Sequence, residues 1–447
     1  MNNKPKIALI NLGCSKNLVD SEIVLGFLNS AGYEVGIDED NADIIIINTC
    51  SFIADAEEES VKVIMEQVAN QEDKKIIVIG CLAQKHGQLL LDEIPELSAV
   101  VGTSDIKNIV NIVNNIVSDS LDNPCKVSSS LDYLQNEEDE RFYITAGSSS
   151  YVKIAEGCDW RCTYCLIPDL KGSYRSRSIE SIVKEVKSLV DNGTTEIILI
   201  AQDTTNYGSD LYGKPSLPLL IKELDKIEEL KWLRLLYTYP KFIDDELINA
   251  IKMSDKVVRY LDIPLQHIHP DILRLMKRPN VDVESLLSKL RCNIPDLAIR
   301  TCFIVGFPSE TEEHFEYLCS FVKSQKFDRV GVFEYSKEEN TPAFNLKNHI
   351  DDEIKTRRRD TLMELQNSIS LENHKLLLGK TIDVLLESID ESGQGEGRSY
   401  LDAPEIDGLV YIDSAASSDY LPGDIIPVKI TNVTAYDLYG VVDIEST

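Results

Sequence analysis

The stretch Gly157-Cys158-Asp159-Trp160-Arg161-Cys162-Thr163-Tyr164-Cys165 places three cysteines in the spacing C-x3-C-x2-C. Residues 151–155 before it alternate in a way typical of a strand, so the cysteines are expected on a loop at a strand end, with Gly157 allowing the turn. Three thiolates on one short loop can hold three corners of a cubane iron–sulfur cluster and leave the fourth iron open for chemistry. The alternatives are core thiols or a structural zinc site, but zinc usually takes four ligands and no fourth Cys or His stands close in sequence.

Length and composition indicate a globular chain of several domains. Its 447 residues suffice for about two to four domains with a large core, and 43% are hydrophobic. No apolar run reaches the length of about 18 residues that a membrane span requires, and the N-terminus has no signal-peptide core. We therefore expect a cytoplasmic protein without a membrane partner. In that compartment the ten cysteines are ligands or reduced thiols rather than disulfides.

The charge balance bears on the partner. The formal net charge is −30, whereas a protein that grips nucleic acid needs a basic surface to displace counterions. The acidic field attracts basic partners. This favours a basic protein over free RNA as substrate, with the alternative that the acidic balance only keeps the chain soluble.

Residues 1 to about 120 alternate apolar strands and helices, which indicates a doubly wound α/β domain with a parallel sheet. We expect strands at 6–10, 43–48 and 75–79 and helices at 20–31, 56–69 and 106–116. Cys14, Cys50 and Cys81 each follow one of these strands. Ligands bind at the carboxyl ends of the strands in such sheets. The three thiols are therefore expected to converge as a second three-cysteine cluster site, although a lone buried cysteine is usually only a small apolar residue.

Residues from about 121 to 145 are polar and turn-rich, which predicts a linker; Cys125 falls there without an assigned role. The strand–helix order then returns, with a helix at 179–192 that ends at Gly193. Strands are expected at 151–155, 196–201, 232–237, 260–263, 298–305 and 329–333. Six such units predict an open or partial β/α barrel, which places its chemistry at the strand ends.

Several polar residues stand at or near those strand ends, namely Gln202, Asp203, Arg234, His267 and Glu310. They could contact a cofactor or substrate, or they could be ordinary loop residues; a lone histidine is more often structural. The remaining cysteines, Cys292, Cys302 and Cys319, are predicted to be core thiols.

The chain changes character from about residue 375, where the helical pattern stops. Strands are expected at 381–386 and 424–431, with a turn marked by Gly393, Gly395 and Gly397. This pattern predicts a small all-β barrel of the oligonucleotide-binding kind. Residues 374–447 carry 4 Lys and Arg against 14 Asp and Glu, so the barrel suits a basic protein tail better than RNA.

The whole chain resembles the methylthiotransferases of the radical S-adenosylmethionine (SAM) class, which share the cysteine spacing and an aromatic residue in the place of Tyr164. Four stretches resemble the RimO type more than the tRNA-modifying MiaB type: Leu12-Gly-Cys-Ser-Lys-Asn-Leu-Val-Asp-Ser-Glu22, Ala201-Gln-Asp-Thr-Thr205, Asp262-Ile-Pro-Leu-Gln-His267 and Asp402-Ala-Pro-Glu-Ile-Asp-Gly408. Ser15 stands where RimO enzymes usually have Pro, which leaves the adjacent Cys14 in place.

The resemblance implies a methylthiotransferase N-terminal domain over residues 4–120, a linker over 121–143, a radical SAM core over 144–373 and a TRAM domain over 374–447. It implies two 4Fe–4S clusters, one on Cys158, Cys162 and Cys165 that binds SAM, and one on Cys14, Cys50 and Cys81 that carries the sulfur. Further cofactor contacts are then expected from Tyr164, Gln202 and Arg234.

The implied reaction adds a methylthio group to the β-carbon of an aspartate in small-subunit ribosomal protein uS12, with a reductant such as flavodoxin or ferredoxin. A tRNA substrate is not expected. Two alternatives are kept: a tRNA methylthiotransferase of the MiaB type, and a non-catalytic metal- or RNA-binding adaptor.

Overall fold

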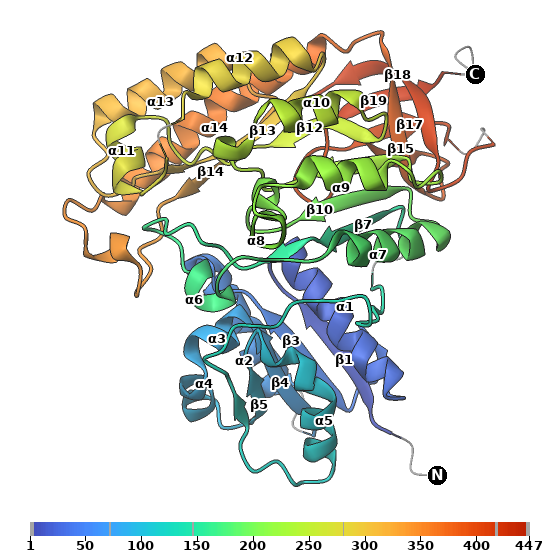
Figure 1. The fold of residues 1–447 in the computed structure, drawn as a ribbon, viewed down its shortest axis with the longest axis vertical. Coiled ribbons are helices and arrows are strands. Elements are labelled where there is room, and N and C mark those ends of the chain that lie inside the picture. Colours follow the sequence, from blue (N-terminus) through green and yellow to red (C-terminus); the bar gives the residue numbers. More distant parts are fainter. Residues whose placement is uncertain (1–3, 71–72, 145–146, 280, 416–418, 444–447) are drawn as a thin grey trace.

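The computed structural model describes residues 4–70, 73–144, 147–279, 281–415 and 419–443. Three units follow one another along the chain: an α/β unit (blue in Figure 1), a larger α/β unit (green to orange) and a β-barrel (red). The predicted fold class, with a doubly wound domain, a partial barrel and a terminal β-barrel, is confirmed. Over the described residues, no helix combines the length and apolar character needed to cross a membrane.

The N-terminal sheet has six parallel strands in the order β2-β1-β3-β4-β5-β6. Their bounds are β1 Lys6–Asn11, β2 Glu34–Gly36, β3 Ile44–Thr49, β4 Lys75–Gly80, β5 Leu97–Val101 and β6 Cys125–Lys126. The three predicted strands are present, and all three lie inside the sheet. The pattern missed the edge strands β2 and β6, which are too short to carry periodicity, and it also missed β5, an internal strand of five residues that Ser98 interrupts. Strand β6 lies in the predicted linker, which therefore extends the N-terminal sheet.

The helices of this unit are α1 Ser15–Ser30, α2 Ala54–Asn70, α3 Cys81–His86, α4 Gln88–Glu93 and α5 Ile109–Val117. Helix α1 begins five residues before the predicted position, directly after Cys14. The Asn17 side chain explains this start, because it donates to the carbonyl oxygens of Leu12 (3.0 Å) and Thr49 (3.1 Å). The first turn of α1 is thereby fixed at the carboxyl edge of the sheet.

The central unit is a partial barrel built on a parallel sheet with the strand order β14-β13-β12-β11-β10-β7. These strands are β7 Ser149–Lys153, β10 Glu196–Ile200, β11 Trp232–Leu235, β12 Val257–Asp262, β13 Ala298–Val305 and β14 Arg329–Glu334. A separate two-stranded ribbon, β8 Ala155–Glu156 with β9 Arg175–Ser176, flanks the cysteine loop. All six predicted strand–helix units are present.

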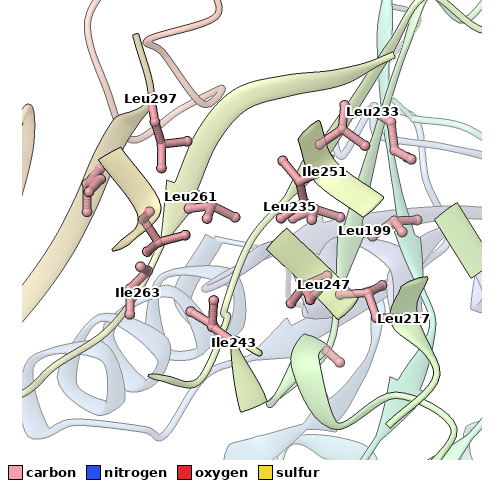
Figure 2. Close-up of a cluster of buried hydrophobic side chains, with 14 of the residues drawn as sticks. Leu199, Leu217, Leu233, Leu235, Ile243, Leu247, Ile251, Leu261, Ile263 and Leu297 are labelled. Atoms are coloured by element: carbon pink, nitrogen blue, oxygen red, sulfur yellow. The ribbon is translucent and has the colours of Figure 1, made fainter. Parts of the chain in front are cut away.

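The helices of the central unit are α6 Ile167–Lys171, α7 Ile179–Asp191, α8 Ser209–Tyr212, α9 Leu217–Leu224, α10 Asp245–Met253, α11 Pro270–Leu275, α12 Val283–Asn293, α13 Glu312–Gln325 and α14 Asp352–Lys375. Figure 2 shows leucines of the strands meeting Leu217 of α9 and Leu247 of α10. This apolar layer covers one face of the sheet and so fixes the strand ends that carry the site.

The C-terminal unit is a closed five-stranded barrel in the order β15-β16-β17-β19-β18. Its strands are β15 Thr381–Ile389, β16 Gly395–Ser399, β17 Val410–Asp413, β18 Ile425–Val433 and β19 Leu438–Val442. All neighbours pair antiparallel except β17 and β19, which pair parallel. The prediction that Gly395 and Gly397 form a turn is wrong, since both lie in β16. They are glycines because a Cβ at Gly397 would stand 2.4 Å from the Leu385 carbonyl oxygen.

Candidate active site

The N-terminal trio, Cys14, Cys50 and Cys81, lies at the carboxyl edge of the first sheet. The residues follow β1, β3 and β4, which are parallel neighbours. Gly13 has φ +93°, and a Cβ there would stand 3.1 Å from the Cys50 Sγ, so only glycine lets the Cys14 loop approach Cys50 this closely. The charges of Cys14 and Cys50 also act on Cys81. The structure therefore brings together the three thiols that the sequence placed after three strands.

The second trio, Cys158, Cys162 and Cys165, lies on the loop after β8. Gly157 has φ +78°, and a Cβ there would stand 2.2 Å from the Ser173 carbonyl oxygen. The loop is held by hydrogen bonds from the Cys158 amide to the Gly172 carbonyl (3.1 Å) and from the Thr163 amide to the Met276 carbonyl (3.1 Å). The expected turn at Gly157 is thus present, and backbone contacts fix where the thiols stand.

Burial makes four of these thiols, including Cys50, reluctant to ionise without a positive partner. It raises the pKa of Cys158, Cys165 and Cys81 to about 12, chiefly through desolvation. A bound metal centre supplies the missing positive charge and deprotonates coordinating thiols outright. Four buried and two half-buried thiols in two trios therefore fit metal-bound thiolates.

The distances between the sulfur atoms of each trio distinguish a cluster site from a site for a single metal ion. Among the described residues, the only group of three ligating side chains whose donor atoms all lie within 4.8 Å of one another is His269, Asp271 and His314. Neither cysteine trio is that compact, whereas sulfurs bound to one zinc ion stand about 4 Å apart. The wider spacing suits an inorganic cluster with its thiolates on separate corners.

The two histidines of this compact group cap helices and do not form a metal site. The Nδ1 of His269 accepts the Asp271 amide (3.3 Å), and the Nδ1 of His314 accepts the Thr311 amide (3.2 Å). A ring whose Nδ1 accepts a hydrogen bond carries its proton on Nε2, which then cannot ligate a metal. These residues therefore cap α11 and α13.

Both cysteine trios border the same interface between the first two units. Cys81 packs against Leu166 and Leu170, which lie directly before and within α6, the helix that follows the second cysteine loop. The Thr103 hydroxyl of the first unit donates to the Leu170 carbonyl at 2.7 Å. Helix α6 thus joins the two cysteine-bearing edges (Figure 1).

A buried charge network crosses this interface. Lys153 contacts Asp20 and lies 2.7 Å from the Glu156 carboxylate, while Lys171 lies 2.8 Å from Asp20. Gln202 donates to the other Glu156 oxygen at 2.7 Å. Burial raises the pKa of Glu156, but Lys153 and Lys171 outweigh burial and hold the pKa below its usual value. The network keeps the two units in register at the site.

Sequence reasoning missed Asp20, Lys153, Glu156 and Lys171. A signal existed for Lys153, because a charged residue inside an otherwise apolar strand needs a buried partner. The partner, Asp20, is 133 positions away, and no local pattern connects them.

Two predicted cofactor contacts lie beside the cysteine loop. Tyr164 meets the ring of Phe307 edge-on, with centroids 6.4 Å apart, between this loop and the end of β13. Gln202 reaches the loop through Glu156, which directly precedes Gly157. Their contact with a cofactor remains a prediction.

Arg234 faces elsewhere. Its guanidinium donates to Glu196 (2.7 Å) and to the carbonyls of Tyr400 (2.9 Å) and Ser399 (3.3 Å). These contacts join the central sheet to the C-terminal barrel. The predicted cofactor contact of Arg234 therefore has no support from the geometry and remains a prediction.

The other strand-end residues fall into two groups. Asp203 accepts from Trp160 of the cysteine loop at 2.7 Å, so it positions that loop. His267 Nε2 and Glu310 Oε1 are buried 3.9 Å apart, and neither atom has a hydrogen-bond partner among the described residues. Of the predicted core thiols, Cys302 is buried and Cys319 is half-buried, but Cys292 is exposed on α12, so that prediction was wrong for Cys292. An amphipathic helix tolerates a thiol on its outer face as well as in the core.

A C-x3-C-x2-C loop at the strand ends of a partial parallel barrel defines the class of radical SAM enzymes. Residues 152–322 match the Radical SAM superfamily, residues 6–102 match Uncharacterized protein family UPF0004, and residues 378–442 match the TRAM domain. The solved structure of the radical S-adenosylmethionine methyltransferase TsrM from Kitasatospora setae, with tryptophan and a SAM analog bound, resembles this chain with TM-score 0.57 at 13% identity. The match covers 81% of this chain and 89% of TsrM, and it shows the fold.

Relatives with much higher identity specify the family. The ribosomal protein uS12 methylthiotransferase RimO of Gloeothece citriformis is 47% identical over 98% of this chain and 99% of the relative. That of Desulforamulus reducens is also 47% identical, with the same two coverages. The chain belongs to the RimO family of radical SAM methylthiotransferases. It is therefore an enzyme whose cofactors include SAM and a 4Fe–4S cluster.

Proposed function

We propose that this chain adds a methylthio group to the β-carbon of an aspartate in ribosomal protein uS12, with one 4Fe–4S cluster on each cysteine trio. The single observation that carries the proposal is the pair of cysteine trios bordering one interface, in a chain 47% identical to RimO enzymes along 98% of its length. The proposed domains are residues 4–120, 144–373 and 374–447, with 121–143 between the first two.

The proposed cluster ligation follows from the positions of the two cysteine trios. Cys158, Cys162 and Cys165 would hold one cluster with an open corner for SAM, and Cys14, Cys50 and Cys81 would hold the other. When bound, these cofactors supply the one-electron chemistry and the sulfur that no side chain can provide for an unactivated C–H bond. The thiols, Asp203 and the backbone contacts of the loop keep the ligands in place.

Exclusion of water is the second task of this chain's residues, because water and other quenchers must be kept from a reactive carbon centre. Helix α6 closes the interface beside the trios together with the Lys153–Asp20–Lys171 network, whose three side chains are 8% exposed or less. Tyr164 and Phe307 add an aromatic wall beside the second loop.

Charge supports a basic protein as substrate. Residues 374–447 hold 14 acidic side chains and 4 basic ones, and the C-terminal barrel is joined firmly to the central unit through Glu196, Arg234 and Arg398. A ribosomal protein carries the complementary charge. The electron must come from outside the chain, and we propose a flavodoxin or ferredoxin as donor.

The test uses reconstituted, reduced enzyme with SAM and either purified uS12 or bulk tRNA. We expect uS12 to gain the mass of one methylthio group on a single aspartate and tRNA to stay unchanged. A mass gain on tRNA alone would identify the MiaB-type alternative. An anaerobic assay should find about eight irons per chain; zinc in their place would identify the adaptor.

A further inference from the structure

Lys16 occupies an unusual position at the junction of the two trios. It is the second residue of α1, two positions after Cys14, and only 9% of its surface is exposed. Its amine lies 3.2 Å from the centre of the Tyr237 ring. Tyr237 follows β11 of the central unit, so this contact spans the interface that both trios border.

This buried lysine forms no ion pair within the part of the chain that the structure describes. Among the residues the structure describes, no carboxylate lies within 4.0 Å of its amine. The neighbouring buried lysines differ, because Lys153 and Lys171 both pair with Asp20. Glu156 is near Lys16, yet its two oxygens are taken by Lys153 and Gln202.

An unpaired buried cation is costly, and the chain has acidic residues to spare. Desolvating an ammonium group costs several kcal/mol unless an anion compensates for it. With a net charge of −30, this protein could readily supply a carboxylate at this position. Cys14, Tyr237 and Glu156 balance part of the charge of Lys16, but the amine has no carboxylate in direct contact among the described residues, which leaves it able to take one from a ligand.

We propose that Lys16 binds the side-chain carboxylate of the substrate aspartate and so selects aspartate over asparagine. The inference rests on the proposed function and adds the residue that recognises the reacting side chain. A carboxylate entering this acidic, water-poor interface needs one positive partner. An ammonium group offers three donors and no acceptor, which suits a carboxylate and disfavours an amide NH2.

The Tyr237 ring fixes the position of the Lys16 amine. The ring covers one side of the ammonium group and stabilises it as a cation–π partner, which leaves the remaining N–H donors for the ligand. A carboxylate bound there would hold its adjacent β-carbon near Cys14, at the interface that the second trio also borders. Lys16 is thus a substrate-binding residue, distinct from the cluster ligands.

The test compares binding and modification of two forms of uS12 by the reconstituted holoenzyme. Mass spectrometry of the wild-type reaction first identifies the modified aspartate, which is then replaced by asparagine in purified uS12. We expect wild-type enzyme to bind the aspartate form about tenfold tighter than the asparagine form, as for one charge-assisted contact. Lys16→Met should lose that preference by weakening only the aspartate complex, and Lys16→Arg should restore part of it.

Lys62→Met is the matched control, because it removes the same charge from a side chain that is 75% exposed on α2. It should leave both affinities within about twofold. Iron content and the EPR spectrum of the clusters should be the same in all variants.

Two outcomes would overturn the inference. Equal preference for aspartate in wild type and Lys16→Met would show that the lysine does not read the carboxylate. If Lys16→Met changed the iron content or the EPR spectrum but kept the preference for aspartate, Lys16 would serve to balance the charge of the cluster on Cys14 and would not bind the substrate. If wild-type enzyme modifies no aspartate of uS12, the proposed function itself fails, and the inference with it.

If Lys16→Met does not fold, the preference of the wild-type enzyme and of Lys16→Arg for the aspartate form still tests the inference.

Discussion

At the residue scale, the six cysteines proposed to hold the clusters lie in two sets. Each trio sits on its own unit. Each loop is fixed by its own backbone contacts, such as the bond from the Cys158 amide to the Gly172 carbonyl. Losing one cluster should therefore leave the other in place.

We predict that Cys158→Ala and Cys50→Ala each lose about four of about eight irons. Cys158→Ala should abolish SAM cleavage, because the open iron that binds SAM is lost with that cluster. Cys50→Ala should retain cleavage and stop sulfur transfer. Iron analysis and chromatography of the SAM cleavage product give the two readouts.

Cys292→Ala is the control, since this thiol is exposed on α12, and it should change neither readout. Residual SAM cleavage in Cys158→Ala at the wild-type rate would contradict the assignment of that loop.

At the element scale, the segment after β6 packs closely against α1. A Cβ on Gly26 of α1 would stand 1.9 Å from the Glu140 carbonyl oxygen. The Phe142 amide donates to the Glu22 carbonyl nearby at 2.9 Å. Glycine in mid-helix is therefore required here by packing.

Gly26→Ala should destabilise the protein by about 1–3 kcal/mol, the range for overpacking. The direction of the stability change is diagnostic, because alanine in a helix interior is otherwise favoured over glycine by about 1 kcal/mol. Gly36→Ala in β2 is the control, since a Cβ there meets nothing within 4 Å. Thermal unfolding monitored by circular dichroism measures both; a stabilised Gly26→Ala variant would show that the segment does not pack on α1.

Elements with strong local patterns were predicted from the sequence, and elements defined by tertiary contacts were not. The apolar strands β3 and β4 carry their own signal, since burial on both faces requires continuous apolar residues. Strand β6 has only two residues, and it exists because β5 offers its edge. The early start of α1 likewise depends on the Asn17 contact with Thr49, 32 positions away.

At the scale of the whole molecule, Glu196 joins the central sheet to the C-terminal barrel. The carboxylate lies 2.7 Å from Arg234 and 2.7 Å from Arg398, and it is fully buried. Burial raises the pKa of Glu196, but the two arginines outweigh burial and lower it to about 2. The ionised carboxylate thus holds two cationic groups of separate units together.

Glu196→Gln should destabilise the protein by about 3–5 kcal/mol, because it leaves two buried guanidinium groups short of an anion. Glu246→Gln, in an ion pair whose side chains are 66% and 61% exposed, should cost less than about 1 kcal/mol. Thermal unfolding at neutral pH compares the two variants. Equal effects would show that the junction does not depend on this charge.

The pH dependence follows from the same carboxylate. A group whose folded pKa is lowered stabilises the protein above its unfolded pKa, here the usual value of 4.5, and this contribution is lost as the pH falls towards the folded value of about 2. The stability difference between wild type and Glu196→Gln should therefore shrink between about pH 4.5 and about pH 2. Hydrogen exchange in β10 and β16 measures it; a constant difference across that window would contradict the assignment.

The sequence by itself determined the three-part order, the strand–helix alternation and the position of six cysteines after strand ends, because these follow from local periodicity and spacing. Only the tertiary structure decided which charges meet their partners: Lys153 with Asp20, Glu196 with Arg398, and Lys16 with the Tyr237 ring. The reason is physical, since the cost of a buried charge depends on its neighbours in space, and these neighbours lie 133, 202 and 221 positions away along the chain.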